Sequence, residues 1–350
     1  MKNIKISASK EYDVIIGKGL LELAGEYIKK AAPEALKAAV ISDDNVAPIY
    51  LENLEKSLKK QGFETGSFVF PHGELSKTGE TYLGILDFLA DSGLTRSDIV
   101  VALGGGVVGD VAGFAAATYL RGTGYVQVPT SLLAMVDSSV GGKTAINLSS
   151  GKNLAGAFCQ PELVLCDIDT LATLRDEHFA EGCAEVLKYA VLGDKELFAH
   201  LFKNGRSFDR EYVIGRCIEM KRDYVCADEF DRGLRQKLNL GHSIGHAIEK
   251  LSDYGVSHGN AVAMGMATMA RLAEKHGFCE KECANEIIKA LEILDLPTES
   301  SYSAKELIEP MLRDKKRGGN RINLIIPREI GHCDIVPMEL ENLAQFMKTE

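Results

Sequence analysis

The sequence predicts an α/β N-terminal domain and an all-α C-terminal domain, and three observations support this fold class. Short apolar runs alternate with helical patterns in the first half, as in a parallel sheet covered by helices. After Thr170, helical periodicity dominates. The chain has 350 residues, and at roughly 150 residues per domain this length indicates about two domains. We therefore expect domains over residues 1–175 and 176–350.

The first half carries the expected strands and three helices between them. The run Ile99–Leu103 is apolar throughout, which indicates a strand covered on both faces. The expected strands are Asp13–Gly17, Ala38–Ser42, Ser67–Phe70, Ile99–Leu103, Tyr125–Val128 and Leu163–Cys166. The expected helices are Ala47–Gln61, Thr78–Asp91 and Val107–Leu120.

The second half is expected to be mainly helical, and the two domains are expected to join near residues 170–178. The helical patterns are Glu177–Leu192, Asp209–Asp228, Arg235–Leu251, His258–His276 and Lys281–Leu294. Only Arg321–Ile326 has the pattern of a strand.

Composition excludes several classes of protein. Hydrophobic residues make up 45% of the chain and charged residues 26%, which is ordinary globular usage and disfavours disorder. The net charge of −10 disfavours duplex nucleic acid as a partner, and no apolar run approaches the roughly 20 residues that span a membrane. Charges interrupt the N-terminal segment, which disfavours a signal peptide, and the eight scattered cysteines form no CxxC pair. We therefore expect a cytoplasmic protein.

Glycine is unevenly distributed. The segment Ile99–Pro161 holds 11 of the 34 glycines in 63 residues. Its acids are Asp110 and Asp137, and its bases are Arg121, Lys143 and Lys152. In an acidic chain, this locally electropositive and glycine-rich segment indicates a site for anionic groups.

Gly104–Gly109 satisfies the GxGxxG pattern between an expected strand and an expected helix. Glycines let backbone amides approach a pyrophosphate, and a helix N-terminus favours its negative charge. The same pattern also suits a simple tight turn. The acid that binds ribose is normally about 20 residues downstream, but the next strand ends in Val128-Pro129-Thr130. Asp43, at an earlier strand end, is the candidate, so a dinucleotide site would have an unusual layout.

Three histidines cluster in the second half. His242 and His246 are four residues apart, which on a helix places them on one face about 6 Å apart along the axis. His258 begins the next expected helix, and Glu185 could add a carboxylate. Three protein ligands are typical of a catalytic zinc site. The alternative is a set of core histidines bonded to the backbone.

Several cations lie near glycines or histidines. Lys143 follows Gly141-Gly142, but the GxxxxGK spacing of an ATP-binding loop is absent. The other candidates are Lys152 beside Asn153, Lys221, Arg235 with Asn239, and Lys315–Arg317. Each alone is most simply a solvated surface charge. Together they favour an anionic substrate.

Six stretches resemble the 3-dehydroquinate synthase family. They are GGGVVGDVAGFAAATYLRG, QVPTSLLAMVDSSVGGKTAIN, GKNLAGAF, AEVLKY, GLRQKLNLGHSIGHAIE and HGNAVAMGM, in the family's order. The resemblance implies a dehydroquinate synthase-like fold, with an α/β N-terminal dinucleotide-binding domain plus an all-α C-terminal metal- and substrate-binding domain. It implies a carbon-oxygen lyase of the shikimate pathway, which leads to the aromatic amino acids. Such a lyase converts 3-deoxy-D-arabino-heptulosonate 7-phosphate (DAHP) into 3-dehydroquinate and phosphate. The steps are transient NAD-dependent oxidation, phosphate elimination, reduction, ring opening and aldol closure.

The resemblance also implies NAD+, one divalent metal (Zn2+ or Co2+), a sugar acid phosphate as substrate and a homodimer. The implied metal ligands are Glu185, His242 and His258, which leaves His246 for catalysis. The implied catalytic residues are His246, Lys143, Lys188 and Asn153. The implied NAD residues are Asp43, Glu74, Lys77, Gly105, Gly106, Val107, Asp110, Thr130, Ser131, Lys152, Thr170, Leu171 and Thr173. The implied substrate residues are Lys143, Asn153, Lys221, Arg235, Asn239, His246, Lys316 and, from a second subunit, Arg121.

The chain departs from the family pattern at a few positions. Ser131 and Ser243 replace common threonines, and Asn260 replaces a common acid and could alter the orientation of His258.

Three rival functions remain open. They are another sugar-phosphate cyclase of the same fold, a metal-dependent alcohol or glycerol dehydrogenase, and an NAD-binding regulatory protein without catalysis. Lys221 and Arg235 favour a carboxylated substrate over the first rival, because an arginine fork can bind both carboxylate oxygens.

Overall fold

The computed structural model describes residues 1–315 and 320–348, and the chain forms two compact units. The first unit contains Met1–Arg175 and Arg210–Phe230, and the second contains Asp176–Asp209 and Asp231–Glu350. The expected boundary at residue 175 coincides with one of these divisions. The segment Arg210–Phe230 groups with the first unit, because helix α7 (Arg210–Ala227) packs against strands β1 and β2.

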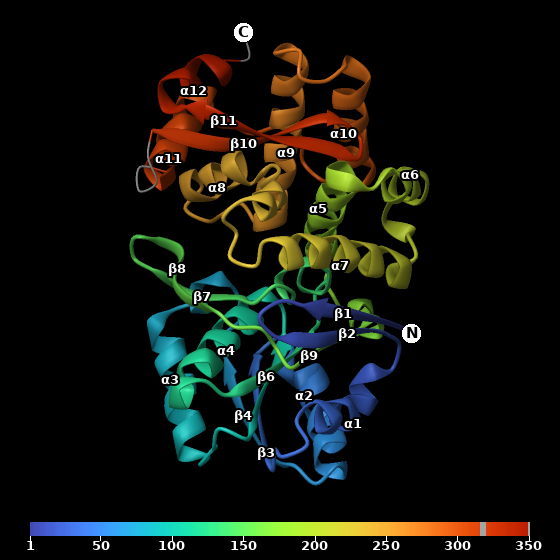
Figure 1. Cartoon of the computed structure of the whole chain (residues 1–350), viewed down its shortest axis with the longest axis vertical. Coiled ribbons are helices and arrows are strands. Elements are labelled where there is room, and N and C mark those ends of the chain that lie inside the picture. Colours follow the sequence, from blue (N-terminus) through green and yellow to red (C-terminus); the bar gives the residue numbers. More distant parts are fainter. Residues whose placement is uncertain (316–319, 349–350) are drawn as a thin grey trace. The chain divides into compact units, whose positions relative to one another are not determined.

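A seven-stranded sheet in the order β1-β2-β9-β6-β5-β3-β4 forms the centre of the first unit (Figure 1). All neighbouring strands are parallel except β1 and β2. The strands are β1 (Lys2–Ser7), β2 (Glu11–Gly17), β3 (Lys37–Asp43), β4 (Glu64–Phe70), β5 (Ile99–Gly104), β6 (Gly124–Pro129) and β9 (Leu163–Asp167). The helices are α1 (Leu20–Ala31), α2 (Ala47–Lys60), α3 (Gly79–Asp91) and α4 (Gly106–Thr118).

Strand β5 contributes to a core on each face of this sheet. Ile99, Val101 and Leu103 pack with apolar residues of α1 and α2. Val100 and Ala102 pack with those of α3 and α4. The expectation of a strand covered on both faces is confirmed, since every residue of β5 is buried.

A hairpin and a π-helical turn complete the first unit. Strands β7 (Lys143–Leu148) and β8 (Gly151–Phe158) pair antiparallel, and both contact α4. The π-helical turn Ala134–Ser138 contacts α4 and α7. The sequence did not predict this hairpin, because its glycines and its serine turn favoured loops.

The second unit is mainly helical and also contains an antiparallel pair of strands, β10 (Arg321–Glu329) and β11 (His332–Glu339). Only β10 was expected. The helices are α5 (Asp176–Gly193), α6 (Lys195–Asn204), α8 (His242–Leu251), α9 (His258–Lys275), α10 (Lys281–Ile293), α11 (Ala304–Lys315) and α12 (Leu340–Phe346). The helix expected over Arg235–Leu251 is interrupted, because Gly241 adopts a left-handed φ of 78° between a 3₁₀ turn (Leu234–Asn239) and α8.

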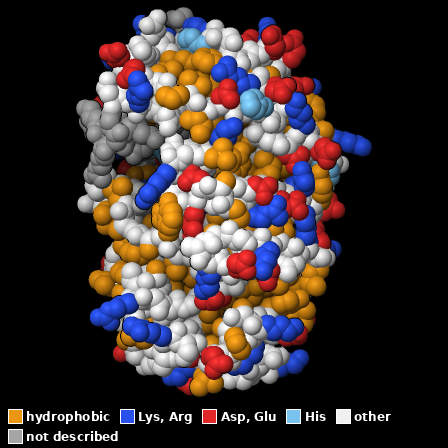
Figure 2. Space-filling view, viewed as in Figure 1, with side chains coloured by type: hydrophobic (Ala, Val, Ile, Leu, Met, Phe, Trp, Pro, Cys, Tyr) orange, Lys and Arg blue, Asp and Glu red, His pale blue; other side chains and the backbone are white. Residues whose placement is uncertain are grey.

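Charges of both signs are interspersed on the molecular face drawn in Figure 2. Within the part of the chain that the structure describes, no helix combines the length and apolar character needed to cross a membrane.

Candidate functional site

Glu185, His242 and His258 converge in the second unit from α5, α8 and α9. The Nε2 atoms of His242 and His258 lie 3.5 and 3.3 Å from Oε1 of Glu185. Glu185 is fully buried, and the candidate ligand atoms of the three residues lie within 4.8 Å of one another. Two imidazole nitrogens and one carboxylate oxygen suit a divalent ion such as zinc.

The other ring nitrogen of each histidine faces an acceptor. Nδ1 of His242 lies 3.0 Å from the carbonyl oxygen of Leu240, and Nδ1 of His258 lies 3.4 Å from Oε2 of Glu249. Burial lowers the pKa of His242 to about 3. Burial also acts to lower the pKa of His258, but hydrogen bonds to Glu185 and Glu249 outweigh it and raise that pKa to about 10. With Nδ1 at these acceptors, both rings turn Nε2 toward Glu185.

Glycines allow the three helices to approach closely enough for this cluster to form. A Cβ atom at Gly265 of α9 would lie 2.0 Å from the carbonyl oxygen of Gly241, just before α8. A Cβ atom at Gly259 would lie 2.4 Å from the carbonyl oxygen of Glu181 on α5. Side chains at these positions would separate the backbones that carry the metal-ligand candidates.

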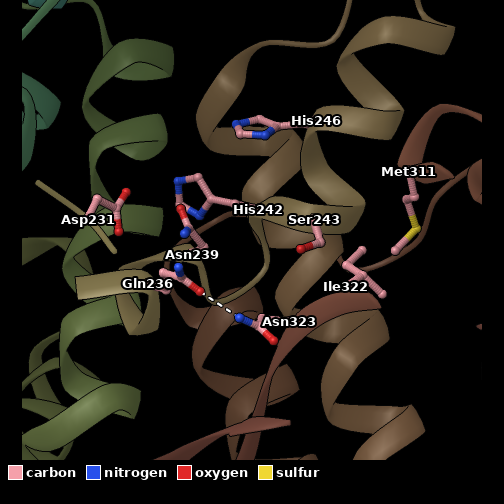
Figure 3. A pocket seen from close by; sticks show the side chains of 9 residues that line it. All are labelled: Asp231, Gln236, Asn239, His242, Ser243, His246, Met311, Ile322 and Asn323. Carbon is pink, nitrogen blue, oxygen red and sulfur yellow. Dashed lines mark hydrogen bonds between the residues drawn. The ribbon is translucent and has the colours of Figure 1, made fainter. Parts of the chain in front are cut away.

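His246 lies one turn beyond His242, with 5.5 Å between the two ring centroids. Figure 3 shows both histidines beside a cavity of about 210 Å³. The cavity is lined by Asp231, Gln236, Asn239, His242, Ser243, His246, Met311, Ile322 and Asn323. Asn239 and His246 were expected in a substrate site. Asp231, Gln236 and Asn323 were not, and Asn323 donates a 2.8 Å hydrogen bond to Gln236.

Two buried cations belong to the same unit. Lys188 is 1% exposed, and its Nζ lies 2.5 Å from Oε2 of Glu185, one turn earlier on α5. Arg235 is 2% exposed on the 3₁₀ turn that precedes α8. Buried cations need anionic partners, and Glu185 is such a partner for Lys188.

The glycine-rich loop of the first unit connects β5 to α4. Gly105 is the N-cap of α4, and Gly106 and Val107 begin the helix. A Cβ atom at Gly104 would lie 2.5 Å from Val108, and one at Gly109 would lie 2.5 Å from Gln127. The backbone N–H of Thr130 donates a 2.9 Å hydrogen bond to the carbonyl oxygen of Gly104. A side chain at Gly104 would displace the branched side chain of Val108, whereas one at Gly109 would meet the flexible end of Gln127. The loop leaves a helix N-terminus at the carboxyl edge of the sheet, where dinucleotides bind.

Asp43 ends β3, the direct neighbour of β5, so its carboxylate lies at the same edge of the sheet. Its Oδ1 accepts 2.9 Å hydrogen bonds from the backbone N–H groups of Asn45 and Val46. Burial raises the pKa of Asp43, although these two hydrogen bonds act to lower it. The tertiary structure thus places an acid near the glycine loop without the usual sequence spacing.

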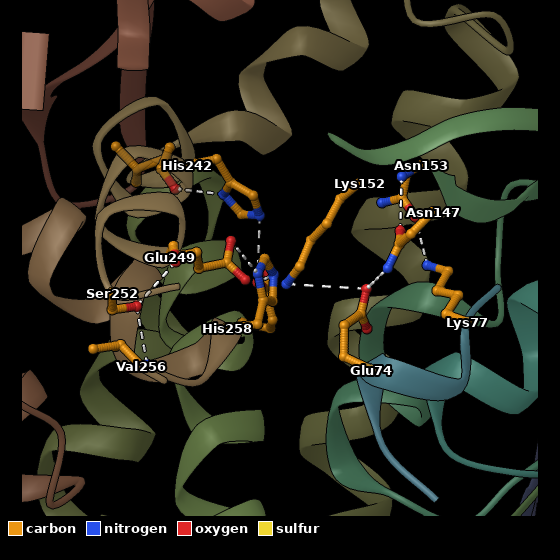
Figure 4. Close-up of polar contacts among 12 residues, drawn as sticks. Glu74, Lys77, Asn147, Lys152, Asn153, His242, Glu249, Ser252, Val256 and His258 are labelled. Carbon is orange, nitrogen blue, oxygen red and sulfur yellow. Dashed lines mark hydrogen bonds and ion pairs between the residues drawn. The ribbon is translucent and has the colours of Figure 1, made fainter. Parts of the chain in front are cut away.

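A polar network joins the end of α4 that carries the loop to the hairpin, and Figure 4 shows Glu74, Lys77, Lys152 and Asn153 of this network. Nζ of Lys77, which is 4% exposed, lies 2.5 Å from both Oδ2 of Asp110 and Oδ1 of Asn153. Nζ of Lys152 lies 4.0 Å from Oε1 of Glu74. Burial raises the pKa of Asp110, and Lys77 opposes this effect. Five residues expected from the resemblance therefore share one network.

The remaining expected residues of the first unit lie on separate elements. Lys221 of α7 donates to the backbone carbonyl and the carboxylate of Asp137. Lys143 begins β7, and Arg121 follows α4 with a left-handed φ of 69°. Tyr50 joins the Thr170–Thr173 turn by donating a 3.1 Å hydrogen bond to the carbonyl oxygen of Thr170. The other members of these sets are Ser131, buried Leu171 and exposed Thr173. Lys316 lies outside the described residues.

Sequence reasoning missed Glu249, Asp137 and Asn147 as polar partners of the expected site residues. Glu249 carried a detectable signal, since it follows His242 by seven residues on the same helical face. Asp137 and Asn147 lie in segments expected to be loops, so no periodicity marked them.

Relatives of this chain are found over nearly its whole length. The 3-dehydroquinate synthase of Streptococcus suis (strain 05ZYH33) is 44% identical over 345 residues, which cover 96% of this chain and 97% of that protein. The 3-dehydroquinate synthase of Caldanaerobacter subterraneus subsp. tengcongensis is 43% identical over 332 residues, which cover 93% of each chain.

Solved structures share the fold. One is 2-epi-5-epi-valiolone synthase from Streptomyces hygroscopicus with NAD+ and Zn2+ bound, with a TM-score of 0.88, 29% identity and 98% of each chain covered. Another is 2-deoxy-scyllo-inosose synthase with carbaglucose-6-phosphate, NAD+ and Co2+, with a TM-score of 0.87, 24% identity and 99% of each chain covered. An iron-containing alcohol dehydrogenase has a TM-score of 0.68 at 16% identity, with 97% of each chain covered.

Two family models match the chain consecutively. Residues 67–181 match the N-terminal part of 3-dehydroquinate synthase, and residues 182–317 match its C-terminal part. With these matches and relatives at 42–44% identity, the chain belongs to the 3-dehydroquinate synthase family.

Proposed function

We propose that this chain converts DAHP into 3-dehydroquinate and inorganic phosphate. The observation that carries the proposal is the buried cluster of Glu185, His242 and His258 with Lys188 bound to Glu185. It combines a metal-ligand set with a cation suited to an anionic, hydroxylated substrate. Membership of a lyase family with matching length supports the same reaction.

Glu185, His242 and His258 would hold one divalent ion, Zn2+ or Co2+. A bound ion of this kind lowers the pKa of a coordinated hydroxyl and polarises a carbonyl. His246 is exposed and lies beside His242 on α8, where its ring would move a proton or contact phosphate. Lys188 would hold a substrate hydroxyl or oxyanion near Glu185.

The first unit would bind NAD+, which accepts a hydride from the substrate and later returns it. The amides of Gly105, Gly106 and Val107 at the start of α4 would hold the pyrophosphate. Asp43 would accept hydrogen bonds from a ribose. The other residues of this proposed site are Glu74, Lys77, Asp110, Thr130, Ser131, Lys152, Thr170, Leu171 and Thr173.

Substrate charges would be neutralised by the remaining cations. Arg235, with Lys221 and Asn239, would bind the carboxylate, because a guanidinium can donate to both oxygens. The groups proposed for the phosphate are Lys143, Asn153, His246 and Lys316, with Arg121 supplied by a second copy of the chain.

Phosphate release tests the reaction. The purified chain with NAD+ and Zn2+ or Co2+ is expected to release phosphate from DAHP, without net accumulation of NADH. Glucose 6-phosphate, a sugar phosphate without a carboxylate, is the comparison substrate for DAHP. Release from glucose 6-phosphate alone would assign another sugar-phosphate cyclase, and this is the second candidate because 2-deoxy-scyllo-inosose synthase, solved with carbaglucose-6-phosphate, shares the fold with a TM-score of 0.87. Stoichiometric NADH formed from glycerol would indicate a dehydrogenase.

The proposed homodimer is tested by mixing two inactive variants. If Arg121 serves the partner's site, co-refolded Arg121→Ala and His246→Ala chains restore one intact site per mixed dimer. Recovery of about a quarter of the wild-type rate is then expected from a two-fold symmetric dimer. No recovery, although mixed dimers form, would place Arg121 in its own chain's site.

A further inference from the structure

We propose that Glu249 is a positioning residue that orients the ring of His258 toward the metal without binding the metal itself. This inference rests on the metal site of the proposed function. It assigns a role to a residue that ends the stretch GLRQKLNLGHSIGHAIE but was not among the expected site residues.

The two ring nitrogens of His258 face two different buried carboxylates. Nε2 lies 3.3 Å from Oε1 of Glu185, and Nδ1 lies 3.4 Å from Oε2 of Glu249. Glu185 is fully buried and Glu249 is 2% exposed. A neutral imidazole has one N–H donor and one acceptor nitrogen, so a carboxylate at Nδ1 keeps the proton there and leaves the Nε2 lone pair for a cation.

His242 shows the same arrangement with a different acceptor. Its Nδ1 lies 3.0 Å from the carbonyl oxygen of Leu240, and its Nε2 points to Glu185. Both histidines therefore offer Nε2 to one point, and each has an acceptor behind the ring. Such outer partners fix the orientation of metal-binding histidines and raise the basicity of the ligand nitrogen.

A second set of residues also converges, and in this set Glu249 would itself be a metal ligand. Ligand atoms of His246, Glu249 and His258 lie within 4.8 Å of one another. A metal held there with Glu249 as a ligand would take Nδ1 of His258 and leave its Nε2 beside Glu185. The set of Glu185, His242 and His258 is favoured, because it uses the Nε2 atoms of two histidines whose Nδ1 atoms already face acceptors.

The backbone of Glu249 also shapes the turn that leads to His258. Its carbonyl oxygen accepts a 2.9 Å hydrogen bond from Oγ of Ser252 and a 2.8 Å bond from the backbone N–H of Tyr254. Oγ of Ser252 in turn accepts a 3.1 Å bond from the N–H of Val256 (Figure 4). The backbone and the carboxylate of Glu249 thus both act on the start of α9, while residue 260 need not supply the acceptor at Nδ1 of His258.

The test measures Co2+ binding by the full-length protein. Glu249→Gln removes the charge, Glu249→Asp keeps the charge but withdraws it by one methylene, and His258→Ala removes a proposed ligand. Asp253→Asn, an exposed change in the following turn, is the matched control. Each variant is titrated with Co2+ against a competing chelator, the visible spectrum of bound Co2+ is recorded, and metal content is measured after dialysis. Thermal unfolding of the metal-free proteins checks folding.

The expected result is one Co2+ per chain in both Glu249 variants, with 10- to 100-fold weaker affinity and a shifted Co2+ spectrum. Asp253→Asn should match the wild type. Loss of binding in Glu249→Gln as complete as in His258→Ala would make Glu249 a ligand and overturn the inference. Unchanged affinity and spectrum in both variants would also overturn it. A wild-type chain that binds no Co2+ would instead refute the proposed metal site.

Discussion

The side-chain amide of Asn147 donates a 2.7 Å hydrogen bond to Oε1 of Glu74. Its carbonyl oxygen accepts a 2.9 Å bond from the backbone N–H of Asn153, which has a left-handed φ of 56°. One side chain therefore joins Glu74 of the proposed NAD site to the start of β8, which carries Lys152 and Asn153. The β7–β8 ladder is irregular between Ile146 and Leu148, so this part of the hairpin depends on such side-chain contacts.

Replacing Asn147 by alanine should weaken both NAD+ and DAHP binding. Two hydrogen bonds of about 1 kcal/mol each are lost, which corresponds to a roughly tenfold or greater rise in the Kd for NAD+ and in the KM for DAHP. Titration of NAD+ and steady-state kinetics measure these changes. Asn204→Ala, which removes an exposed hydrogen bond to His200 at a helix end, is the control. Unchanged constants in Asn147→Ala would show that this part of the hairpin holds its shape without this residue.

Lys77→Met should destabilise the first unit by about 3 kcal/mol, because it leaves Asp110 beside a buried apolar group. This loss of stability is at the low end of the range for broken buried ion pairs, because the raised pKa of Asp110 lets the carboxylate take up a proton. The double variant Lys77→Met/Asp110→Asn should recover at least about half of the loss. Urea unfolding measures both. Lys56→Met, at an exposed ion pair with Glu52, should change stability by less than about 1 kcal/mol.

Metal content should separate the two histidines of α8. His242→Ala is expected to lose the metal, because its Nε2 faces Glu185, whereas His246→Ala should keep one metal per chain and lose activity. Atomic emission after dialysis measures the metal. Equal loss in both variants would support the simple interpretation that histidines four residues apart are both ligands.

Gly265→Ala should weaken metal binding without removing any ligand. The new methyl group would lie 2.0 Å from the carbonyl oxygen of Gly241, so the chain before α8 must move away from α9 together with His242. Overpacking of this kind costs about 1–3 kcal/mol. The melting temperature and the Co2+ affinity should both fall. Gly79→Ala, where a Cβ atom would meet nothing within 4 Å, should leave both unchanged.

Asp98 should stabilise the first unit in a pH-dependent way. It accepts 2.8 Å bonds from the backbone N–H groups of Thr95 and Lys37 and a 3.1 Å bond from that of Leu36. Burial acts to raise its pKa, but these bonds outweigh it and lower the pKa below the ordinary value of 3.8. The stabilisation that Asp98 provides is therefore complete above its ordinary pKa of 3.8 and disappears as the pH falls through the lowered pKa.

Asp98→Asn should lower the free energy of unfolding by about 2 kcal/mol at pH 7. The difference from the wild type should narrow below pH 4, as measured by urea unfolding across a pH series. The exposed Asp87→Asn is the control. A difference that stays constant down to pH 2 would contradict this account.

The sequence identified the strands of the parallel sheet because their burial on both faces requires continuous apolar runs, as in Ile99–Leu103. Repeated glycines likewise marked the start of α4. Strand β1 and the hairpin β7–β8 escaped detection, because short polar or glycine-containing strands resemble loops until their partners are known.

The composition and motifs of this chain by themselves determined its fold class, the glycine loop at Gly104–Gly109 and the histidines from which a metal site could be built. Spacing along one helix suggested His242 and His246 as a pair, and the family resemblance implied Glu185, His242 and His258 as the ligands. In the folded chain, His242 and His258 face Glu185. Only the tertiary structure shows how these atoms come together, because the orientation of each ring depends on Leu240 or Glu249 behind it and on glycines that let three helices meet. Local periodicity reports which face of an element a residue occupies, and packing between elements decides which atoms meet there.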